Sequence, residues 1–437
     1  MHTSTKNVVI VSQVFYPDSQ ATSQLLSALA QEFIKDSSAS EAKDLSPLDH
    51  KNFSVKVLCC YPSQARGQSD VVPKREKWGE VLIKRGGLSI DSKKSLFHRA
   101  LSYGCFLLWL TYQLIFRINS HTEQILVVTN PPFAPLVVWF CSNLRRMFFR
   151  PLNYTILLHD LYPDGLIALN KLAATNLLAK GWSYLNKKAF FRARKVITLG
   201  RDMSNHCHKV YQLPLEKCQV ITNWSPVNFE KSIPLTPEET NLWQQLPDSI
   251  KLNKPFIVQY SGNMGLWHNM DAIVEAASLI QDLNIHFLMI GDGRRKAGAI
   301  AKAQELGLSN ITWLPFQDLA TLTDSLQCAH ISLVSQREEV LGIMVPSKFY
   351  GILASRRAVL AQVPAESEVA LTIKEHNCGI ILETDEAIRL AECLRTLYLD
   401  LKQVKIMGDN AGIAYEQHHS FSKAVFAFKK LLSDSVK

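Results

Sequence analysis

The sequence predicts an α/β protein made of two doubly wound domains in tandem. A chain of 437 residues is longer than one ordinary hydrophobic core accommodates. Its composition, 47% hydrophobic and 20% charged, is that of a folded globular protein. Short apolar, β-branched runs alternate with amphipathic helical patterns along most of the chain. This alternation is typical of βαβ units around a parallel sheet that is buried on both faces.

The predicted strands fall into two series. Helical stretches such as 23–34 and 177–193 separate most strands of the first series, which are expected at residues 7–15, 53–60, 80–86, 124–130, 154–160, 195–200 and 219–223. The polar stretch 36–52 is interpreted as a surface insertion. The pattern then pauses at 224–254, where prolines and polar residues predict a linker, so that the first domain would span residues 1–223.

The second series predicts another doubly wound domain over residues 255–419. Its strands are expected at 256–262, 286–293, 311–316, 331–335, 358–363 and 379–383, and its helices at 271–282, 295–306, 318–328, 347–355 and 366–376. Ligands of such folds bind at the carboxyl ends of the strands. If the two domains face each other, the active site is expected in the cleft between them.

Charge is divided unevenly along the chain. Residues 1–222 contain 28 Lys and Arg against 15 Asp and Glu, a net charge of +13, whereas the remainder contains 20 against 24, a net charge of −4. A basic first half predicts an anionic partner there, which could be a membrane surface, a phosphorylated substrate or nucleic acid. Nucleic acid fits worst, because the basic clusters lie beside apolar aromatic helices such as 136–150, a mixture typical of contact with lipid headgroups. A solvated helix face is the alternative.

Several features bear on the compartment. The apolar stretch 101–116 holds 16 uncharged residues, short of the ~20 needed to span a bilayer, so a buried helix or, next, an interfacial one is expected. No signal peptide is seen before the strand-like residues 8–11. Nine scattered cysteines without a Cys-x-x-Cys pair favour a reducing compartment, and hence a cytoplasmic protein. His206-Cys207-His208 is not expected to bind metal, because successive side chains of a helix diverge.

Two glycine-rich turns follow strands of the second domain. In "YSGNMG" (260–265), a Gly-x-x-Gly turn between a strand and a helix lets backbone N–H groups face a phosphate, although a purely structural turn would look the same. In "MIGDG" (289–293), a strand ending in two glycines allows a flat ring to approach the backbone. The nearby Arg294 could pair with a phosphate, but an exposed arginine at a helix start is ordinary.

Two further stretches carry candidate catalytic groups. "LLHDLYP" ends a strand with His159 and Asp160, where a doubly wound fold places its functional residues, although a buried histidine bonded to backbone is the alternative. "EEVLGIMVPSK" (338–348) combines two carboxylates with a lysine at a helix start, where Ser347 could cap the helix. A lysine in a first turn opposes the helix dipole, which is easier to understand if Lys348 meets an anion.

These motifs together resemble glycosyltransferase family 4 of the GT-B fold, in particular the bacterial transferases of colanic acid, O-antigen and related polysaccharide assembly. The resemblance runs from about residue 8 to residue 399. The segments that carry it are "FYPDSQATSQLLSALA" (15–30), "VVTNPP" (127–132), "LHDLYPD" (158–164), "VITNW" (220–224), "YSGNMG", "MIGDG", "VPSKFYGILASRRAVLA" (345–361) and "ESEVALTIKEHNCGIIL" (366–382).

The resemblance implies transfer of a sugar from a nucleoside diphosphate sugar, expected to be UDP-linked, to an acceptor, with retention of the anomeric configuration and without a metal or other cofactor. The acceptor would bind the first domain and the nucleotide the second, and helix 420–434 would pack on the first domain. A lipid-linked glycan is the expected acceptor, which places the protein peripherally at the inner face of the cell membrane.

The family pattern also implies roles for individual residues. The donor phosphates would meet Gly262, Asn263, Met264 and Gly265; the base would meet Gly291, Gly293 and Phe316. Arg294, Pro346 and Ser347 would complete nucleotide-sugar binding, and the acceptor side would hold Tyr16, Ser19, Thr22 and Asp160. For catalysis we expect Lys348 to stabilise the leaving diphosphate, Glu338 or Glu339 to position the sugar, and His159 to orient it.

One departure from the family pattern concerns the ribose. The second glutamate of the usual pattern is replaced by Gly351, so a carboxylate contact to the ribose is not expected there. Three rival functions follow from this loss and from the charge distribution: a GT-B nucleotide-sugar 2-epimerase, a non-catalytic GT-B scaffold, and a membrane-surface binding protein. Turnover of the donor without an acceptor would identify the first, absent or weak nucleotide binding the second, and lipid binding independent of nucleotide the third.

Overall fold

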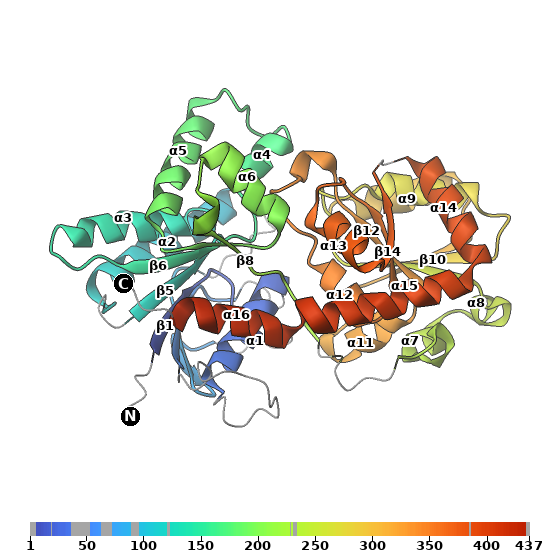
Figure 1. The fold of residues 1–437 in the computed structure, drawn as a ribbon, viewed down its shortest axis with the longest axis horizontal. Helices are drawn as coiled ribbons and strands as arrows, with labels where there is room; N and C mark the ends of the chain where they lie inside the picture. The colour runs from blue at the N-terminus through green and yellow to red at the C-terminus, as the bar shows by residue number, and fades with distance from the viewer. Residues whose placement is uncertain are drawn as a thin grey trace. The chain divides into compact units, whose positions relative to one another are not determined.

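The chain folds into two compact units. The structure is a computed structural model that describes residues 6–18, 20–35, 53–62, 72–88, 96–119, 123–227, 229, 234–383 and 386–433, so that Ser19 and the expected insertion 36–52 lie outside the described residues. The first unit comprises residues 1–199, 203–222 and 422–437, and the second comprises residues 200–202 and 223–421. Each unit has its own sheet (Figure 1).

The first unit contains an eight-stranded sheet of order β3-β4-β2-β1-β5-β6-β7-β8. Its strands are β1 (Lys6–Val11), β2 (Phe53–Cys59), β3 (Arg75–Trp78), β4 (Val81–Arg85), β5 (Glu123–Val128), β6 (Asn153–Leu157), β7 (Val196–Thr198) and β8 (Cys218–Val220). Every pair is parallel except β3 with β4. The strand order without β3 is that of a doubly wound fold, which reverses direction between β1 and β5.

All helices of the first unit except the last lie between these strands in the chain. They are α1 (Ala21–Ile34), α2 (Leu96–Phe116), α3 (Ala134–Arg146), α4 (Asp164–Ala168), α5 (Leu177–Arg192), α6 (Arg201–Tyr211, whose first two residues cluster with the second unit) and α16 (Phe421–Ser433). The last helix lies beside α1, where Phe428 packs edge-on against Phe33 with ring centroids 6.4 Å apart (Figure 1).

The second unit contains a six-stranded, fully parallel sheet of order β11-β10-β9-β12-β13-β14. Its strands are β9 (Phe256–Ser261), β10 (Ile285–Ile290), β11 (Ile311–Leu314), β12 (Ile331–Ser335), β13 (Ala358–Gln362) and β14 (Gly379–Leu382). Its longer helices are α9 (Met270–Leu279), α10 (Lys296–Glu305), α11 (Leu319–Gln327), α12 (Lys348–Ala354), α13 (Glu368–His376), α14 (Ala387–Leu399) and α15 (Leu401–Ala414).

Both faces of the second sheet are buried, as the apolar strands predict. Val258 and Tyr260 of β9 belong to one core cluster, whereas Ile257, on the other face, belongs to a second cluster. The second cluster also includes Trp243 and Ile250 from α7 (Asn241–Gln245) and α8 (Asp248–Asn253). These two short helices lie in the stretch expected to be a linker, and they pack on the second sheet. The predicted fold class, two doubly wound parallel sheets, is confirmed.

Candidate functional site

The carboxyl edge of the second sheet gathers three of the predicted segments. The strand order reverses between β9 and β12, so the loops that follow these two strands flank the point where doubly wound folds bind ligands. The loop after β9 carries the 260–265 turn, and the loop after β12 leads through the 3₁₀ turn Glu338–Val340 to α12. The 291–293 turn follows β10, the strand next to β9.

The glycines of these turns allow two loops to pack backbone against backbone. Gly262, Gly291 and Gly293 have φ angles of +142°, +129° and +152°, which side-chain-bearing residues rarely adopt. A Cβ on Gly291 would lie 2.0 Å from the carbonyl oxygen of Gly262, and a Cβ on Gly293 would lie 2.4 Å from that of Met264. The N–H of Met264 donates to the carbonyl of Asp292 at 2.8 Å. Because Gly291 and Gly293 have no side chains, the 260–265 turn can pack directly against them.

Lys348 extends beneath the first of these turns. Its Nζ lies 3.6 Å from the centroid of the Tyr260 ring, and its Cε would be 3.1 Å from a Cβ on Gly262. Part of the residue reaches solvent, but the amine itself is buried and finds no hydrogen-bond partner among the described residues. Burial lowers the pKa of Lys348 well below its usual range. The amine is thus enclosed next to the backbone of the 260–265 turn, where it could become a cation.

His268 completes the surroundings of this amine. Its ring packs edge-on to Tyr260 with centroids 6.1 Å apart, and its Nδ1 lies 2.5 Å from the carbonyl oxygen of Ser335. Burial, with a smaller contribution from Lys348, lowers the pKa of His268 to about 3. A neutral ring with its proton on Nδ1 therefore donates to Ser335. Tyr260 and His268 were absent from the expected site because the contact of Tyr260 with Lys348, and that of His268 with Tyr260, depend on the tertiary fold.

The other predicted donor residues lie around the same edge. Asn263 and Arg294 are exposed, Met264, Gly265 and Pro346 are buried, and Phe316 is 57% exposed. The Phe316 ring would contact a Cβ on Gly291 at 3.3 Å, so its exposed face borders the glycine turns. The expectation that Ser347 caps α12 is wrong. Its backbone is already helical (φ −61°, ψ −26°), and its side chain makes no capping bond within the described part of the chain.

The two candidate carboxylates differ in their contacts. Glu338 and Glu339 are both exposed in the turn that follows β12. Glu339 pairs with Arg337 at 2.6 Å, and the hydrogen bond to this guanidinium lowers the pKa of Glu339. The backbone N–H of Arg337 donates to the carbonyl of Trp267 at 3.0 Å, which ties this turn to the loop after β9.

Gly351 faces helix α11 rather than an open site. A Cβ there would lie 3.3 Å from Cδ1 of Leu326, tighter than an ordinary contact. The residue is buried in the middle of α12. The close packing explains why a small residue occupies the position that the family pattern gives to a glutamate.

At the carboxyl edge of the first sheet, His159 and Asp160 follow β6. Their backbone N–H groups both donate to Thr129 Oγ1, at 3.0 and 3.4 Å. Burial lowers the pKa of His159 to about 4 and raises that of Asp160 to about 6, although both residues keep some exposed surface. A neutral imidazole and a carboxyl that titrates near neutrality can both exchange hydrogen bonds with hydroxyl groups of a sugar.

Tyr16 lies at the same edge, after β1. Its ring stacks on Trp78 with centroids 4.2 Å apart, and its carbonyl oxygen accepts from the buried Arg85 at 2.9 Å. Arg85 in turn pairs with Glu76 at 2.6 Å. Thr22 is half-buried in the first turn of α1. Tyr16 is therefore fixed by contacts from two strands, β3 and β4, and these contacts involve residues that the sequence did not single out.

His206 contacts a residue of the "LHDLYPD" segment instead of its sequence neighbours. Its Nε2 lies 2.9 Å from Oδ1 of Asp164, whose other oxygen accepts from the hydroxyl of Tyr211. His208 turns toward the carbonyl of Leu213, and Cys207 is buried. The hydrogen bonds from His206 and Tyr211 lower the pKa of Asp164 despite its burial. These contacts stabilise the start of α4.

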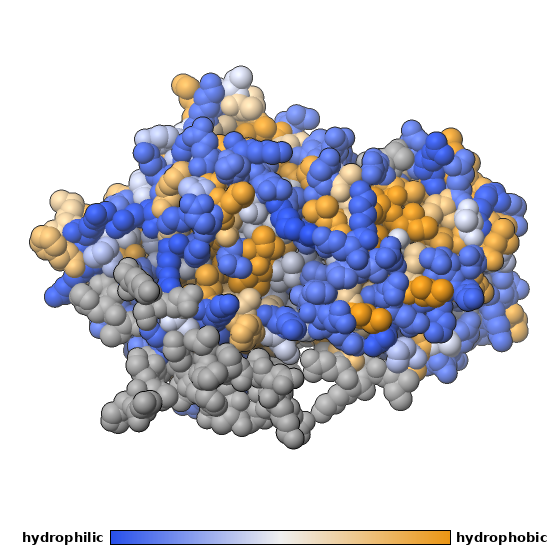
Figure 2. All heavy atoms as spheres, viewed as in Figure 1, coloured by the Kyte–Doolittle hydropathy of each residue, from blue (hydrophilic) through white to orange (hydrophobic). Residues whose placement is uncertain are grey.

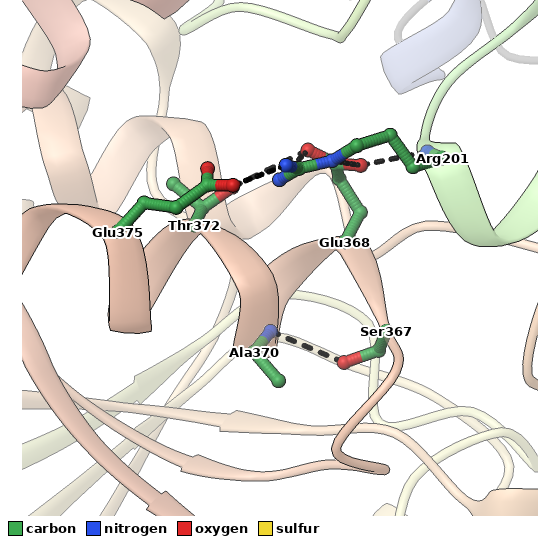
Figure 3. Close-up of polar contacts among 6 residues, drawn as sticks. All are labelled: Arg201, Ser367, Glu368, Ala370, Thr372 and Glu375. Atoms are coloured by element: carbon green, nitrogen blue, oxygen red, sulfur yellow. Dashed lines mark hydrogen bonds and ion pairs between the residues drawn. The ribbon is translucent and has the colours of Figure 1, made fainter.

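A buried ion pair holds the start of α13 (Figure 3). Glu368 is buried, and its two carboxylate oxygens accept from Nε and Nη2 of Arg201, each at 2.9 Å. The backbone N–H of Arg201 adds a third bond at 2.7 Å, and Nη1 of Arg201 pairs with Glu375. Ser367 caps the helix by accepting from the N–H of Ala370. Sequence reasoning missed this pair because 167 residues separate its members.

Two doubly wound sheets in tandem, with glycine turns at the switch point of the second, are the architecture of the GT-B fold. Residues 243–412 match the model of the family Glycosyl transferases group 1. The match covers most of the second unit and indicates a glycosyltransferase that uses a nucleotide sugar as its donor.

Its relatives are distant. The chain is 23% identical to WbjE of Pseudomonas aeruginosa, named as a probable glycosyltransferase, over 77% of this chain and 83% of the relative. It is 25% identical to WcaI of Escherichia coli (strain K12), whose name places it among glycosyl transferases of colanic acid biosynthesis, over 78% and 81%. The Anabaena Alr3699/HepE structure with UDP-glucose superposes with a TM-score of 0.65 at 13% identity, covering 98% of this chain and all of that one. This likeness supports the fold.

Proposed function

We propose that the protein transfers a sugar from a UDP-linked donor to a lipid-linked glycan at a membrane surface, in polysaccharide assembly. The observation that carries the donor half of this proposal is the enclosed amine of Lys348. It lies beneath a glycine turn at the switch point of the second sheet, without a partner among the described residues. A diphosphate is an anion of the right kind to supply that partner. The HepE complexes with UDP and UDP-glucose are consistent with this donor class.

In the proposed reaction, the bond between the anomeric carbon and the diphosphate oxygen breaks, and the anomeric carbon bonds to a hydroxyl oxygen of the acceptor. Negative charge grows on the departing diphosphate, which takes up the proton of that hydroxyl. The backbone N–H groups of the 260–265 turn and Lys348 stabilise that charge. Glu338 or Glu339 positions the sugar, and His159 orients it. Phe316 offers an exposed ring beside Gly291 on which the base stacks. Retention of configuration and independence from metal ions belong to the proposal and are tested by NMR of the product anomer and by assay in EDTA.

The acceptor half of the proposal rests on a surface formed by α2, α3 and α5, called here the helical face. Helix α3 packs against both α2 and α5. Helix α2 carries exposed apolar side chains along its length. Apolar side chains also reach the surface at the end of α3 and the start of α5, where Figure 2 shows orange atoms at the left and top edges of the first unit. The exposed members of the helical face are Phe97, Leu101, Leu108, Tyr112, Phe116, Phe140, Met147, Phe148, Phe149, Leu177, Leu178, Tyr184, Leu185 and Phe191.

Exposed cations accompany these apolar side chains. They are Arg117, Arg146, Arg150, Lys180, Lys188 and Arg192. Arg145 is an exception to the expected basic cluster, because it is buried and donates to the carbonyls of Leu114 and Ile118 at the end of α2. Apolar side chains ringed by Lys and Arg are the pattern of a surface that lies on anionic lipid. Helix α2 was a membrane-span candidate, but none of the described helices is long and apolar enough to cross a bilayer.

The proposal is tested with radiolabelled UDP-sugars and a bacterial membrane extract. Transfer of label into the organic-solvent phase supports a lipid-linked acceptor. Release of free sugar or an altered nucleotide sugar without an acceptor would instead favour the 2-epimerase, and failure of every nucleotide sugar to bind would favour the scaffold. We expect Lys348→Ala to lower kcat/KM by about 100-fold or more, a typical loss for one charge-stabilising group. A loss smaller than about threefold, under ~1 kcal/mol, would refute the role of Lys348.

Sedimentation with vesicles tests the helical face. We expect the double variant Phe148→Ser, Phe149→Ser to weaken binding to phosphatidylglycerol vesicles by roughly tenfold, because two apolar side chains no longer enter the interface. The matched control is Leu252→Ser, which removes an equally exposed apolar side chain from the second unit. Equal binding by the double variant and the control would exclude this part of the helical face as the lipid contact.

A further inference from the structure

The enclosed amine of Lys348 raises the question of its charge before a ligand arrives. A buried ammonium without a hydrogen-bond partner is strongly disfavoured. The ring of Tyr260, 3.6 Å from Nζ, offsets only part of this desolvation cost. The desolvation cost is therefore the larger effect, and the ligand-free protein holds Lys348 as a neutral amine.

The titratable groups beside the amine do not reverse this conclusion. Tyr260 contacts it with its ring face, and burial raises the pKa of this phenol, so that it carries no charge. His268 packs edge-on against Tyr260 and is also neutral, held by its bond to the carbonyl of Ser335. Neither group supplies the negative charge that would keep an ammonium in place. A bound anion is the missing partner.

We propose that binding of a nucleoside diphosphate at this turn takes up one proton, because the diphosphate converts Lys348 from a neutral amine into an ammonium. The proton comes from solvent and adds to the lone pair of Nζ, and no other bond is made or broken. This inference rests on the proposed function, in which Lys348 meets the donor diphosphate. It makes donor affinity fall as the pH rises, in addition to any titration of the chemical step.

Tyr260 and His268 are then positioning residues for the amine. The hydroxyl of Tyr260 donates to the carbonyl of Asn263 at 2.8 Å, which fixes the turn over Lys348, while its ring supports the amine from the other side. His268 fixes the edge of that ring. Gly262 leaves the space between turn and lysine, since a Cβ there would lie 3.3 Å from Nζ.

Calorimetry of UDP binding measures the proton directly. The titration is run at about pH 8.5, well above the second phosphate pKa of about 6, so that UDP itself has no proton to exchange. Phosphate and Tris buffers have different ionisation enthalpies, and the dependence of the observed heat on the buffer gives the number of protons taken up. We expect about one proton for the wild-type protein, and a Kd that rises about tenfold per pH unit between about pH 8 and 9.5. Binding of UDP without proton uptake would overturn this inference but leave the proposed function intact. Absence of UDP binding would overturn both.

Three variants assign the proton. Lys348→Met should bind UDP more weakly and without proton uptake, whereas His268→Asn should keep the uptake. Loss of uptake in His268→Asn with retention in Lys348→Met would assign the proton to the histidine and refute the proposal. Tyr260→Phe keeps the ring and should keep the uptake, while Lys405→Met, at an exposed ion pair on α15, is the matched control and should behave as wild type. A pH-independent Kd in the wild-type protein would also refute it.

Discussion

The carboxyl edges of the two sheets differ in the groups that they present. The second edge presents mainly backbone groups of glycine turns, whereas the first presents side chains. At the second sheet, three glycines with positive φ let two loops interlock. Lys348 is enclosed beside Gly262, and Lys296 donates to the carbonyl of Gly291 at 2.6 Å. At the first sheet, His159 and Asp160 are held through Thr129, and Tyr16 is held by Trp78 and Arg85. In the proposed function, the edge of the second sheet binds the diphosphate, which every donor shares, whereas the edge of the first binds acceptors, which differ and are distinguished by side chains.

The two units also differ in how their buried titratable groups respond to pH. His268, His286, His330 and His419 of the second unit are largely buried, and burial lowers their pKa values to about 3 or 4. His330 must stay neutral because its Nδ1 accepts from the N–H of Ile257 at 2.9 Å. In the first unit, burial lowers the pKa of His159 to about 4 and raises that of Asp160 to about 6.

The largest expected effect is therefore a selective loss of stability in the second unit between pH 7 and 5. Between a folded pKa of about 4 and the unfolded value of about 6.5, the unfolded state binds more protons, so stability falls as the pH falls. Four such histidines together lower the free energy of unfolding by several kcal/mol, since each pKa unit corresponds to about 1.4 kcal/mol. In the first unit the raised pKa of Asp160 acts in the opposite direction and offsets His159.

Hydrogen exchange, read peptide by peptide and corrected for intrinsic rates, measures this difference. We expect protection to decrease in β9, β10 and β12 on going from pH 7 to 5, and to change little in β5 and β6. His286→Gln should reduce the pH dependence in the second unit, because it removes one of the four groups. Equal losses of protection in both units would contradict the comparison.

The next largest effect tests whether the glycine turns at the carboxyl edge of the second sheet need their close backbone packing. Gly291→Ala places a Cβ 2.0 Å from the carbonyl oxygen of Gly262 at a φ of +129°, so we expect it to lower the free energy of unfolding by about 3 kcal/mol and to abolish UDP binding. Gly298→Ala is the matched control, because Gly298 lies on α10 with open space around it. There alanine should stabilise the protein by up to ~1 kcal/mol. Urea unfolding and calorimetry measure both.

The ion pair at α13 is expected to contribute less, because Arg201 is 37% exposed. Arg201→Ala leaves the buried carboxylate of Glu368 without its guanidinium, which we expect to cost about 2 kcal/mol after allowance for that exposure. Arg389→Ala, which breaks the exposed pair with Glu392, should change stability by less than ~0.5 kcal/mol. Thermal unfolding of both variants at one pH and ionic strength checks the difference, and equal shifts would show that burial of Glu368 does not matter.

The features that could be predicted from sequence are those determined by residues close together in the chain. Apolar runs and turn glycines indicate buried strands and their ends, so both parallel sheets were predicted. The edge strand β3 was missed because its sequence, "REKW", consists of three charged residues and a tryptophan and has no apolar run. Lys348 was noticed because a lysine at a helix start is locally unfavourable. Its neighbours Tyr260 and His268 were not, because their sequence positions, like those of Arg201 and Glu368, say nothing about which distant residue they contact.

The smallest expected effect concerns Gly351, for which the sequence and the structure suggest different reasons for the glycine. The family pattern treats it as a lost ribose contact, but its Cβ position faces Leu326 at 3.3 Å. Gly351→Ala gains up to ~1 kcal/mol of helix propensity and loses a similar amount to the tight contact, so we expect a change in unfolding free energy of less than ~1 kcal/mol. Gly351→Glu, by contrast, would bury a carboxylate against α11, so it should destabilise the protein without improving the Kd for UDP. Tighter UDP binding by Gly351→Glu would show that the position still faces the ribose, and that Gly351 marks a lost contact instead of a packing constraint.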